Sequence, residues 1–466
     1  MISNPPPAPP RRTARRSPLP AIGLTVLVAL GAFAGATAIF AGRTQTLARD
    51  LTTQLNTAAS ATGVVTVTQT AYQRGLTSST QTMTIRMQPQ GSDRPLDMIL
   101  TNHIQHGPLP GLRSVGQAII DTDIAFKDPQ VQAAYVKAFP NRKPTLHTVV
   151  GLGGGTDSAL DVPAGTVTDQ GTTVTWQAAS GTLNVAGPDT RSALTWPGLT
   201  VVSSDGGATL SGLTANGTSR RTGDVGSLGT GSGTLAVQKI AVTGSGQAFD
   251  LGGLKVSSDT TESGGYYSSA MKYDAATMNV AGQVFDDLQL HMGMNHLAGA
   301  PLQRILTVIQ NAQKAAGTPA TSGRAAMPDF TAAQQQQLQA DVLALLKGQP
   351  VIQLERLSVR RPAGDVVVSG QVSVPGAATL NADQLAHLAQ APMMIGSMVS
   401  ANLDVRGAEA AVTELLGSFG QNGAGVAQNL HAMEQDGYVT RSGGNLSTKL
   451  RVHNGDFTMN GKSLGQ

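Results

Sequence analysis

The hydrophobic positions of this chain follow a period of two over most of its length. Between Gly63 and the C-terminus, apolar residues alternate with polar ones in short runs, as in Met83, Ile85 and Met87. This spacing is typical of strands with one covered face, and such strands form antiparallel sheets. Further runs of this kind are Leu183/Val185, Leu235/Val237, Leu254/Val256, Met271/Tyr273, Met278/Val280, Val372/Val374, Leu450/Val452 and Phe457/Met459.

The longest alternating run consists of Leu288, Leu290, Met292 and Met294, which share one face of a predicted strand. Turn residues separate many of the runs, as at Asp205-Gly206-Gly207 and Asn454-Gly455. His291 falls between two of the apolar residues and therefore lies on the polar face.

The second half of the chain also contains three segments with helical spacing. Leu302, Ile305, Leu306 and Ile309 follow Pro301 at positions that form one helix face. The two other sets are Leu338, Val342, Leu345 and Leu346, which precede a capping Gly348, and Val412, Leu415 and Leu416. We therefore predict an α+β, β-rich fold in which long, meandering antiparallel sheets carry amphipathic helices on one face.

A different pattern precedes all of these elements. Residues 21–41 are uncharged and apolar on every side, and four arginines, Arg11, Arg12, Arg15 and Arg16, stand before them. About 20 such residues span a bilayer, and arginines stay in the cytoplasm. The prediction is a single transmembrane helix with a cytoplasmic N-terminus, which exports the bulk of the chain from the cytoplasm. A cleaved signal peptide ending near Ala36-Thr37-Ala38 is the alternative.

The flanking segments complete the predicted organisation. Residues 1–20 form a Pro/Arg-rich cytoplasmic tail without apolar periodicity, which predicts disorder. Residues 42–62 carry Leu47, Leu51 and Leu55 at helical spacing and form a stalk. Residues 63–466 form the exported domain, with a lobe boundary near 250–300 if there are two lobes.

Composition narrows the possible functions. The 466 residues include no cysteine, which excludes disulfides, zinc thiolates and thiol catalysis. Charged residues make up 13% and the net charge is +3, with the four tail arginines contributing to it. A basic stripe with interleaved aromatic residues is missing, so nucleic-acid binding has no support.

Short motifs near both ends of the exported region resemble one known family. Tyr72, Arg74, Gly75 and Ser78 lie in a Tyr-x-Arg-Gly-x-x-Ser block, and His106-Gly107-Pro108 follows. Near the C-terminus, Asn454-Gly455-Asp456-Phe457 precedes Asn460-Gly461-Lys462. In this order, the motifs are similar to those of the YdgA-like bacterial family, the domain of unknown function 945. The resemblance implies a single-pass inner-membrane protein of Gram-negative bacteria whose bulk lies in the periplasm, and it provides no catalytic residue or cofactor.

Candidate chemical sites are few. His103 and His106 have the spacing of two metal ligands, but no third ligand lies nearby in sequence, and a strand that enters a turn at Gly107-Pro108 is the favoured explanation. Gly151 to Thr156 lacks the Gly-Lys-Ser/Thr of a phosphate loop and predicts a hairpin connection. Asp157 and Asp161 lack the surroundings of a glycosidase pair. A periplasmic hydrolase is therefore the least favoured hypothesis.

Two non-enzymatic functions remain. One is a binding or scaffolding role for an envelope protein that the sequence does not identify, and the oligomeric state is equally open. The other is the binding or transfer of a lipid along an apolar sheet face, with Leu288, Leu290, Met292 and Met294 facing the lipid and Met271 and Met278 beside them. A helix packed over that face, such as Leu302 to Ile309, argues for an ordinary core. An exposed apolar face of several hundred Å² argues for lipid.

Overall fold

A computed structural model describes residues 65–464, apart from 88–94, 113, 170, 223–227, 245–246, 317–329, 382–383, 385–397, 419–422 and 454. In this part of the chain the strands join one antiparallel sheet of 22 strands. The first ten are β1 (Val65–Arg74), β2 (Ser78–Met87), β3 (Leu96–His106), β4 (Ala118–Phe126), β5 (Thr145–Val150), β6 (Thr156–Val162), β7 (Gly165–Asp169), β8 (Thr172–Trp176), β9 (Ala179–Ala186) and β10 (Asp189–Ser203).

The later strands are longer, and helices interrupt them. They are β11 (Gly206–Arg221), β12 (Gly229–Gly244), β13 (Gln247–Ser263), β14 (Tyr266–Val280), β15 (Gln283–Ala298), β16 (Val351–Arg361), β17 (Gly364–Ser373), β18 (Ser400–Ala408), β19 (Thr440–Ser442), β20 (Asn445–His453), β21 (Asp456–Met459) and β22 (Lys462–Ser463). The helices are α3 (Pro129–Ala138), α4 (Gly299–Ala316), α5 (Ala332–Lys347), α7 (Glu409–Ser418) and α8 (Gly423–Gln435), with short 3₁₀ turns η1 (Pro110–Leu112) and η2 (Pro375–Thr379).

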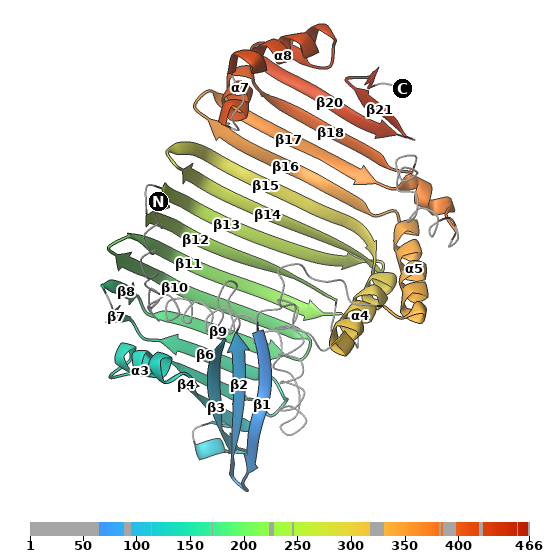
Figure 1. Ribbon diagram of the computed structural model, residues 1–466. Coiled ribbons are helices and arrows are strands. Elements are labelled where there is room, and N and C mark those ends of the chain that lie inside the picture. Colours follow the sequence, from blue (N-terminus) through green and yellow to red (C-terminus); the bar gives the residue numbers. More distant parts are fainter. Residues whose placement is uncertain are drawn as a thin grey trace, which may run out of the picture.

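Each strand pairs mostly with its neighbour in sequence, so the sheet meanders from one end of the molecule to the other (Figure 1). Three pairings join strands that are not neighbours in sequence: β6 with β9, β8 with β10, and β18 with β20. The strand β10 pairs with β9 through residues 189–195 and with β8 through residues 199–202. The bent β10 therefore joins the strongly curved N-terminal part, β1–β9, to the long open sheet, β11–β22.

The largest hydrophobic core fills the curved N-terminal part. Its centre is formed by Trp176 and Trp196, which are almost completely buried. The helix α3 covers this core: Asp128 caps its first turn, Pro129 occupies the first helical position, and the ring centre of Phe139 lies 5.3 Å from that of Trp176. The indole of Trp176 donates to the carbonyl of Pro163 at 2.9 Å, which satisfies its polar atom inside the core.

A crease crosses the long sheet from β11 to β15. Gly212, Gly253 and Asp287 have positive φ angles of 62°, 63° and 47°, and they lie in one row, with Gln238 and Ala276 on the strands between them. Trp196 and Leu199 of β10 are three residues apart, yet both belong to the same core, and Leu210 and Leu213 of β11 both pack against it. Strict alternation would put one of each pair outside. The crease therefore reverses the alternation and keeps apolar residues on one face.

The predicted strands and helices are largely confirmed. Every alternating run named above lies in a strand, except that Val374 follows the end of β17, and the three helical sets lie in α4, α5 and α7. Gly348 caps α5 as expected. The sheet passes through residues 250–300 without interruption, because β12 to β16 pair continuously.

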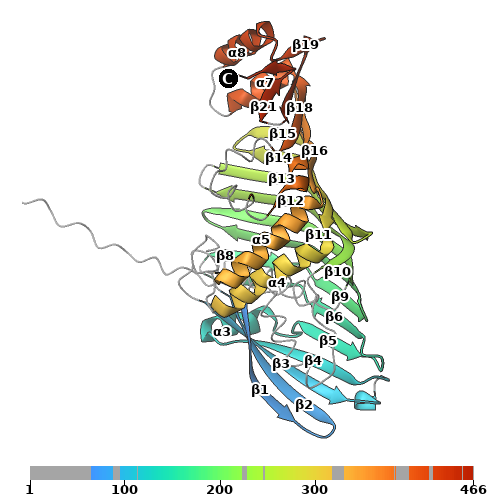
Figure 2. The ribbon, with the colours of Figure 1, turned by 90° about the vertical axis from the view of Figure 1, so that its right-hand side faces the viewer.

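The helices lie on one side of the sheet, and the described ones stand at the edge and the two ends of the long sheet face. Figure 2 shows α3, α4, α5, α7 and α8 on one side of the sheet, and Figure 1 places α4 and α5 beside the strand ends. The reason is geometric: α4 follows directly from the end of β15 and pairs with α5, where Arg304 contacts the buried Asp341 at 2.6 Å. The two helices therefore pack side by side, and Leu343 and Leu346 of α5 pack against Ala377 and Leu380 at η2.

The predicted membrane anchor is not represented in this fold. Among residues 65–464, with the gaps given above, no helix has the length and apolar character that crossing a membrane requires. The run 21–41, the tail 1–20 and the stalk 42–62 lie outside the described residues.

Candidate functional site

The most distinctive feature of the molecule is an apolar face on the long sheet, which we call the inner face. Its composition follows from the strand register. Leu194 of β10 starts a row of directly paired residues that ends at Leu290 of β15. The intervening members are Ala215, Leu235, Val256 and Tyr273. Because paired residues share a face, six strands contribute one continuous apolar row.

Two parallel rows extend this apolar surface toward the C-terminus. Met271 pairs with Met292, and Met292 with Leu354. In the second row, which lies two residues further along β15, Met294 pairs with Ile352, and Ile352 pairs with Val372. The same rows continue through Leu403 and Leu450 to Met459, and through Ala401 and Val452 to Phe457.

Many of these side chains are exposed to solvent. Their exposed fractions range from 37% for Leu235 to 57% for Ile352, and Met271, Met292, Met294, Leu357, Val372 and Phe457 lie between. Single exposed apolar residues are ordinary, but eight on one face of a sheet form a contiguous patch. Such patches mark places where a protein contacts another molecule.

The opposite, outer face is polar and carries ion pairs. His291 contacts Asp274 at 2.7 Å, and Lys239 contacts Asp250 at the same distance. The predicted position of His291 on the polar face is therefore correct, although Asp274 and the neighbouring strand leave its side chain only 19% exposed. The apolar residues of the long sheet are therefore concentrated on the inner face, and the sheet is not apolar throughout.

Helices enclose the inner face on three sides and turn it into a trough. At the N-terminal end, α3 and β1–β3 lie on the inner side, and at one edge α4 and α5 line the strand ends (Figures 1 and 2). At the C-terminal end, α7 packs on the same face, because Gly407, the partner of Val366, lies against Val412. Strands are about 4.8 Å apart, so the face from β12 to β20 is about 34 Å long.

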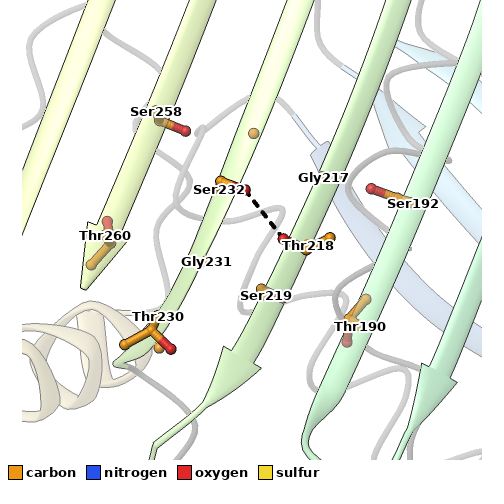
Figure 3. A pocket seen from close by; sticks show the side chains of 12 residues that line it. Thr190, Ser192, Gly217, Thr218, Ser219, Thr230, Gly231, Ser232, Ser258 and Thr260 are labelled. Carbon is orange, nitrogen blue, oxygen red and sulfur yellow. Dashed lines mark hydrogen bonds between the residues drawn. The ribbon is translucent and has the colours of Figure 1, made fainter. Parts of the chain in front are cut away.

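One region of the trough has small, uncharged side chains in place of large ones. A hollow of about 360 Å³ lies over β10–β13, toward the α4 edge (Figure 3). Its floor is formed by Gly217, Gly231 and Gly233. The hydroxyl of Ser192 lies beside Gly217, and that of Ser258 lies beside Gly233, because these residues are paired on neighbouring strands. The hollow belongs to the same face as the apolar rows, since Ser192, Gly217, Gly233 and Ser258 continue directly into Met271 and Met292.

A charged side chain lies at one end of the inner face. Arg361, at the end of β16, is 7% exposed and contacts Glu414 of α7 at 2.5 Å. Its guanidinium carbon lies 4.6 Å from the ring centre of Phe285. Its Nε has no hydrogen-bond partner among the described residues. The pair attaches α7 to the sheet and places a carboxylate beside the arginine.

The structure separates the two candidate metal ligands. His106 contacts the hydroxyl of Ser79 at 2.8 Å, whereas His103 is exposed and contacts Asp123 at 3.1 Å. Residues three apart in a strand point to opposite faces, so these histidines of β3 cannot bind one ion together. The described residues contain no cluster of three or more metal-ligating side chains.

The other weak candidates also have structural roles. Gly151 to Gly155 forms the turn between β5 and β6, as expected for a hairpin connection. Asp157 contacts Asn184 at 2.5 Å, and Asp161 contacts Arg142 at 3.0 Å. Neither carboxylate faces the trough, since the buried residues of β6 alternate with them.

The family-like motif residues fall at two places far from the trough floor. Tyr72 and Arg74 end β1, the Gly75 amide donates to the carbonyl of Ser78 at 2.8 Å, and His106 ends β3. Gly107 donates to Gln117 at 2.7 Å and precedes the cis-peptide bond to Pro108. These residues shape adjoining turns at one tip of the sheet.

The C-terminal motif joins the last strands to α8. The Asn460 amide donates to the carbonyl of Tyr438 at 3.0 Å, and the ammonium of Lys462 donates to the carbonyl of Asp436 at 2.7 Å. Asn460 and Gly461 have φ angles of 48° and 81°, a combination that suits a tight hairpin turn. The motif residues therefore have structural explanations.

Sequence reasoning identified one strand of the inner face but missed its extent. Leu288, Leu290, Met292 and Met294 do lie on this face. Ile352, Leu354 and Leu357 of β16 were missed, because a bulge at residues 355–356 breaks their alternation. The bulge keeps Leu354 and Leu357 on one face, and no simple period of two reveals this.

Comparison with known proteins gives a family but no function. A family described as "Bacterial protein of unknown function (DUF945)" matches residues 20–465. No curated protein and no solved structure matches the chain.

Proposed function

The chain belongs to the bacterial DUF945 family, and from its own geometry we propose that it binds an amphiphile whose acyl chains lie on the inner face of the trough. The observation that carries this proposal is the row of exposed apolar side chains from Leu235 to Phe457, opposite a polar outer face. This was the second of the two functions that the sequence left open, and the uncovered sheet face favours it over a scaffold with a filled core.

The shape of the trough favours flexible chains over a flat protein surface. The walls formed by α3, α4–α5 and α7 stand on the same side as the apolar rows, so a second sheet cannot lie flat on the floor. Acyl chains can enter such a space, and one bilayer leaflet contributes about 15 Å of hydrocarbon, half of about 30 Å. The 34 Å face is long enough for chains of that length.

The side chains of the floor suit a ligand of irregular shape. Met271, Met292 and Met294 lie on two adjacent rows, and methionine is flexible and polarisable. The uncharged hollow beside them accommodates polar but neutral atoms of the same molecule. The proposal keeps the single-pass, periplasm-facing topology expected from residues 11–41, which would place the trough near a source of lipid.

The first test is to identify what the purified full chain carries. Native mass spectrometry and organic extraction of the chain in detergent, followed by exchange into a second detergent, are expected to show about one retained phospholipid or similar amphiphile per chain. A ligand-free mass in both detergents would contradict the proposal and favour a protein-binding role.

A matched pair of variants connects the retained lipid to the inner face. Ile352 and Gln353 are neighbours on β16 and point to opposite faces. Ile352→Glu places a carboxylate against hydrocarbon, and we expect it to lower lipid retention about tenfold or more, because an unpaired charge is costly in an apolar contact. Gln353→Glu adds the same charge on the outer face and is expected to retain lipid fully. Equal retention by both variants would overturn the assignment of the site.

A further inference from the structure

A second exposed apolar patch lies at the tip of the N-terminal strands. It consists of Leu76, Leu109, Leu112, Val115 and Leu152, which we call the tip patch. Leu76 is fully exposed, Leu112 is 88% exposed, and the other three are more than half exposed. The trough does not account for these side chains, because they belong to the turns β1–β2, β3–β4 and β5–β6.

Hydrogen bonds hold these three turns together as one surface. The amide of His106 donates to Thr77 at 2.8 Å, which joins the end of β3 to the first turn. The amide of Gln117 donates to Val150 at 2.7 Å, and its side chain donates to Leu152 at 2.8 Å, which joins the second turn to the third. The aliphatic side chains are therefore presented by a connected backbone and not by separate loose loops.

The tip projects away from the rest of the sheet. Figures 1 and 2 show the β1–β2 turn at the end of the molecule opposite α7 and α8. Leu112 has a φ of 59°, a conformation that non-glycine residues seldom adopt, and its amide donates to Leu109 at 3.1 Å. A tight turn thus holds leucines outward at a protruding end.

We propose that the tip patch inserts into the surface of a phospholipid bilayer. The charge of the turns favours this occupant: residues 75–77, 107–117 and 151–155 contain no aspartate or glutamate and one arginine, Arg113. Arg74 ends β1 next to the first turn. Basic residues beside protruding aliphatic ones suit a surface with phosphate headgroups above hydrocarbon.

The residue types also distinguish a bilayer from a protein partner. Strong protein-binding positions are enriched in tryptophan, tyrosine and arginine, whereas leucine and valine are under-represented there. The tip patch is entirely leucine and valine, presented on turns, and contains no aromatic side chain. Hydrocarbon accepts such side chains without requiring a complementary shape. This inference is independent of the trough and of its ligand.

The absence of cysteine allows a direct test with the full chain. Leu76→Cys and Leu112→Cys variants each carry a single labelling site for the fluorophore NBD, and Ser204→Cys at the exposed β10–β11 turn is the control. The labelled chain is reconstituted in phosphatidylcholine vesicles with 30% phosphatidylglycerol. Doxyl-labelled lipid is placed either in the host vesicles or in added acceptor vesicles.

In one of the two lipid arrangements, we expect at least twofold quenching of the fluorophore at 76 and 112 and none at 204. No quenching in either arrangement would overturn the proposal. Protection of the fluorophore from water without quenching by doxyl lipid would also overturn it, and would indicate a protein pocket.

A second measurement separates insertion from electrostatic attraction. The double variant Leu76→Asn/Leu112→Asn removes apolar side chains without changing charge, and both positions are too exposed to affect folding. With the fluorophore at Leu152→Cys, we expect the vesicle-bound fraction or its quenching to fall about tenfold. Unchanged quenching in this variant would contradict insertion. The trough variant Ile352→Glu is expected to leave quenching unchanged, so the two proposals fail separately.

Discussion

Asp97 on β3 shows how a single buried carboxylate makes the stability of the N-terminal sheet depend on pH. Its side chain is 10% exposed and accepts two hydrogen bonds from Arg86, at 2.8 and 2.9 Å, with Lys127 at 3.8 Å. The bonds from Arg86, and secondarily the positive charges of Arg86 and Lys127, hold the pKa of Asp97 below its ordinary value. Burial acts in the opposite direction but does not outweigh them.

From this we predict the effect of Asp97→Asn. A depressed pKa in the folded state contributes stability that is complete above the unfolded value, near 4, and is lost as the pH falls through the folded value. The variant is expected to lose about 1 kcal/mol of unfolding free energy at pH 7, a modest amount because Arg86 is 57% exposed. It should also show a flatter decline in stability below pH 4. Urea unfolding between pH 2 and 7 measures both effects.

The control for this prediction is Asp123→Asn. Asp123 contacts His103, but its side chain is 75% exposed, so its removal is expected to change stability by less than about 0.5 kcal/mol. Equal losses of unfolding free energy in the two variants would mean that burial does not determine how much the Arg86–Asp97 pair contributes to stability.

At the residue scale, sequence alone predicted which positions are apolar but not which of them stay exposed. Met292 and Met294 were expected on one strand face, and they are there. Leu76 and Leu112 could not be recognised in this way, because an isolated leucine in a turn belongs to no periodic pattern. Their exposure is a property of three turns that come together in space, and sequence spacing contains no information on that arrangement.

At the element scale, the crease explains how strands of 15–17 residues keep one apolar face. Gly212, Gly253 and Asp287 adopt left-handed backbone on alternate strands, and the face continues from Val237 to Ile240 through the reversal. If alternation is followed along β12 or β13 alone, the apolar residues in the two halves of the strand are predicted to lie on opposite faces. The crease joins them, and this becomes visible only after the strands are placed in register.

This role predicts that Gly253 tolerates substitution poorly. In Gly253→Ala the new Cβ would lie 2.9 Å from the Cβ of Ala276, and the positive φ adds strain of about 1–3 kcal/mol. We expect the variant to lose about 2 kcal/mol of unfolding free energy, as measured by denaturant titration.

Gly233→Ala, on β12, is the matched control for Gly253→Ala. Its φ is not positive, and the nearest atom to an added Cβ is the hydroxyl of Ser258 at 3.3 Å. We expect it to be neutral or slightly stabilising, because alanine restricts the unfolded chain. Equal losses in the two variants would mean that the crease does not require the special backbone.

The helices illustrate what an element's pattern can and cannot predict. Helical spacing located α4, α5 and α7, and the Asp128-Pro129 pair before α3 is a start signal that could have located that helix as well. The glycine-rich beginning of α8 conceals its period. Where the helices pack was not predictable, because the Arg304–Asp341 pair that joins α4 to α5 connects residues far apart in sequence.

At the scale of the whole molecule, the inner face of the trough and the N-terminal core are parts of one surface. Leu194 packs against the core around Trp176 and also begins the row that reaches Leu290 on β15. Within the described residues, β1–β9 and α3 curl over this surface at one end, and its apolar side chains stay exposed over β12–β20. A ligand on the open part therefore takes the place that packed side chains occupy in the closed part.

It follows that removal of the proposed ligand should weaken the fold. A ligand that binds only the folded state at a hundred times its Kd stabilises it by about 2.7 kcal/mol. We expect the full chain, stripped by repeated detergent exchange, to unfold a few degrees lower than the lipid-loaded chain, and re-addition of the extracted lipid to restore the Tm. Gln353→Glu should show the same restoration, whereas Ile352→Glu should unfold at one temperature with or without lipid. Identical Tm values for the stripped and loaded wild-type chain would mean that the open face is stable when bare, and would remove the energetic reason for a resident ligand.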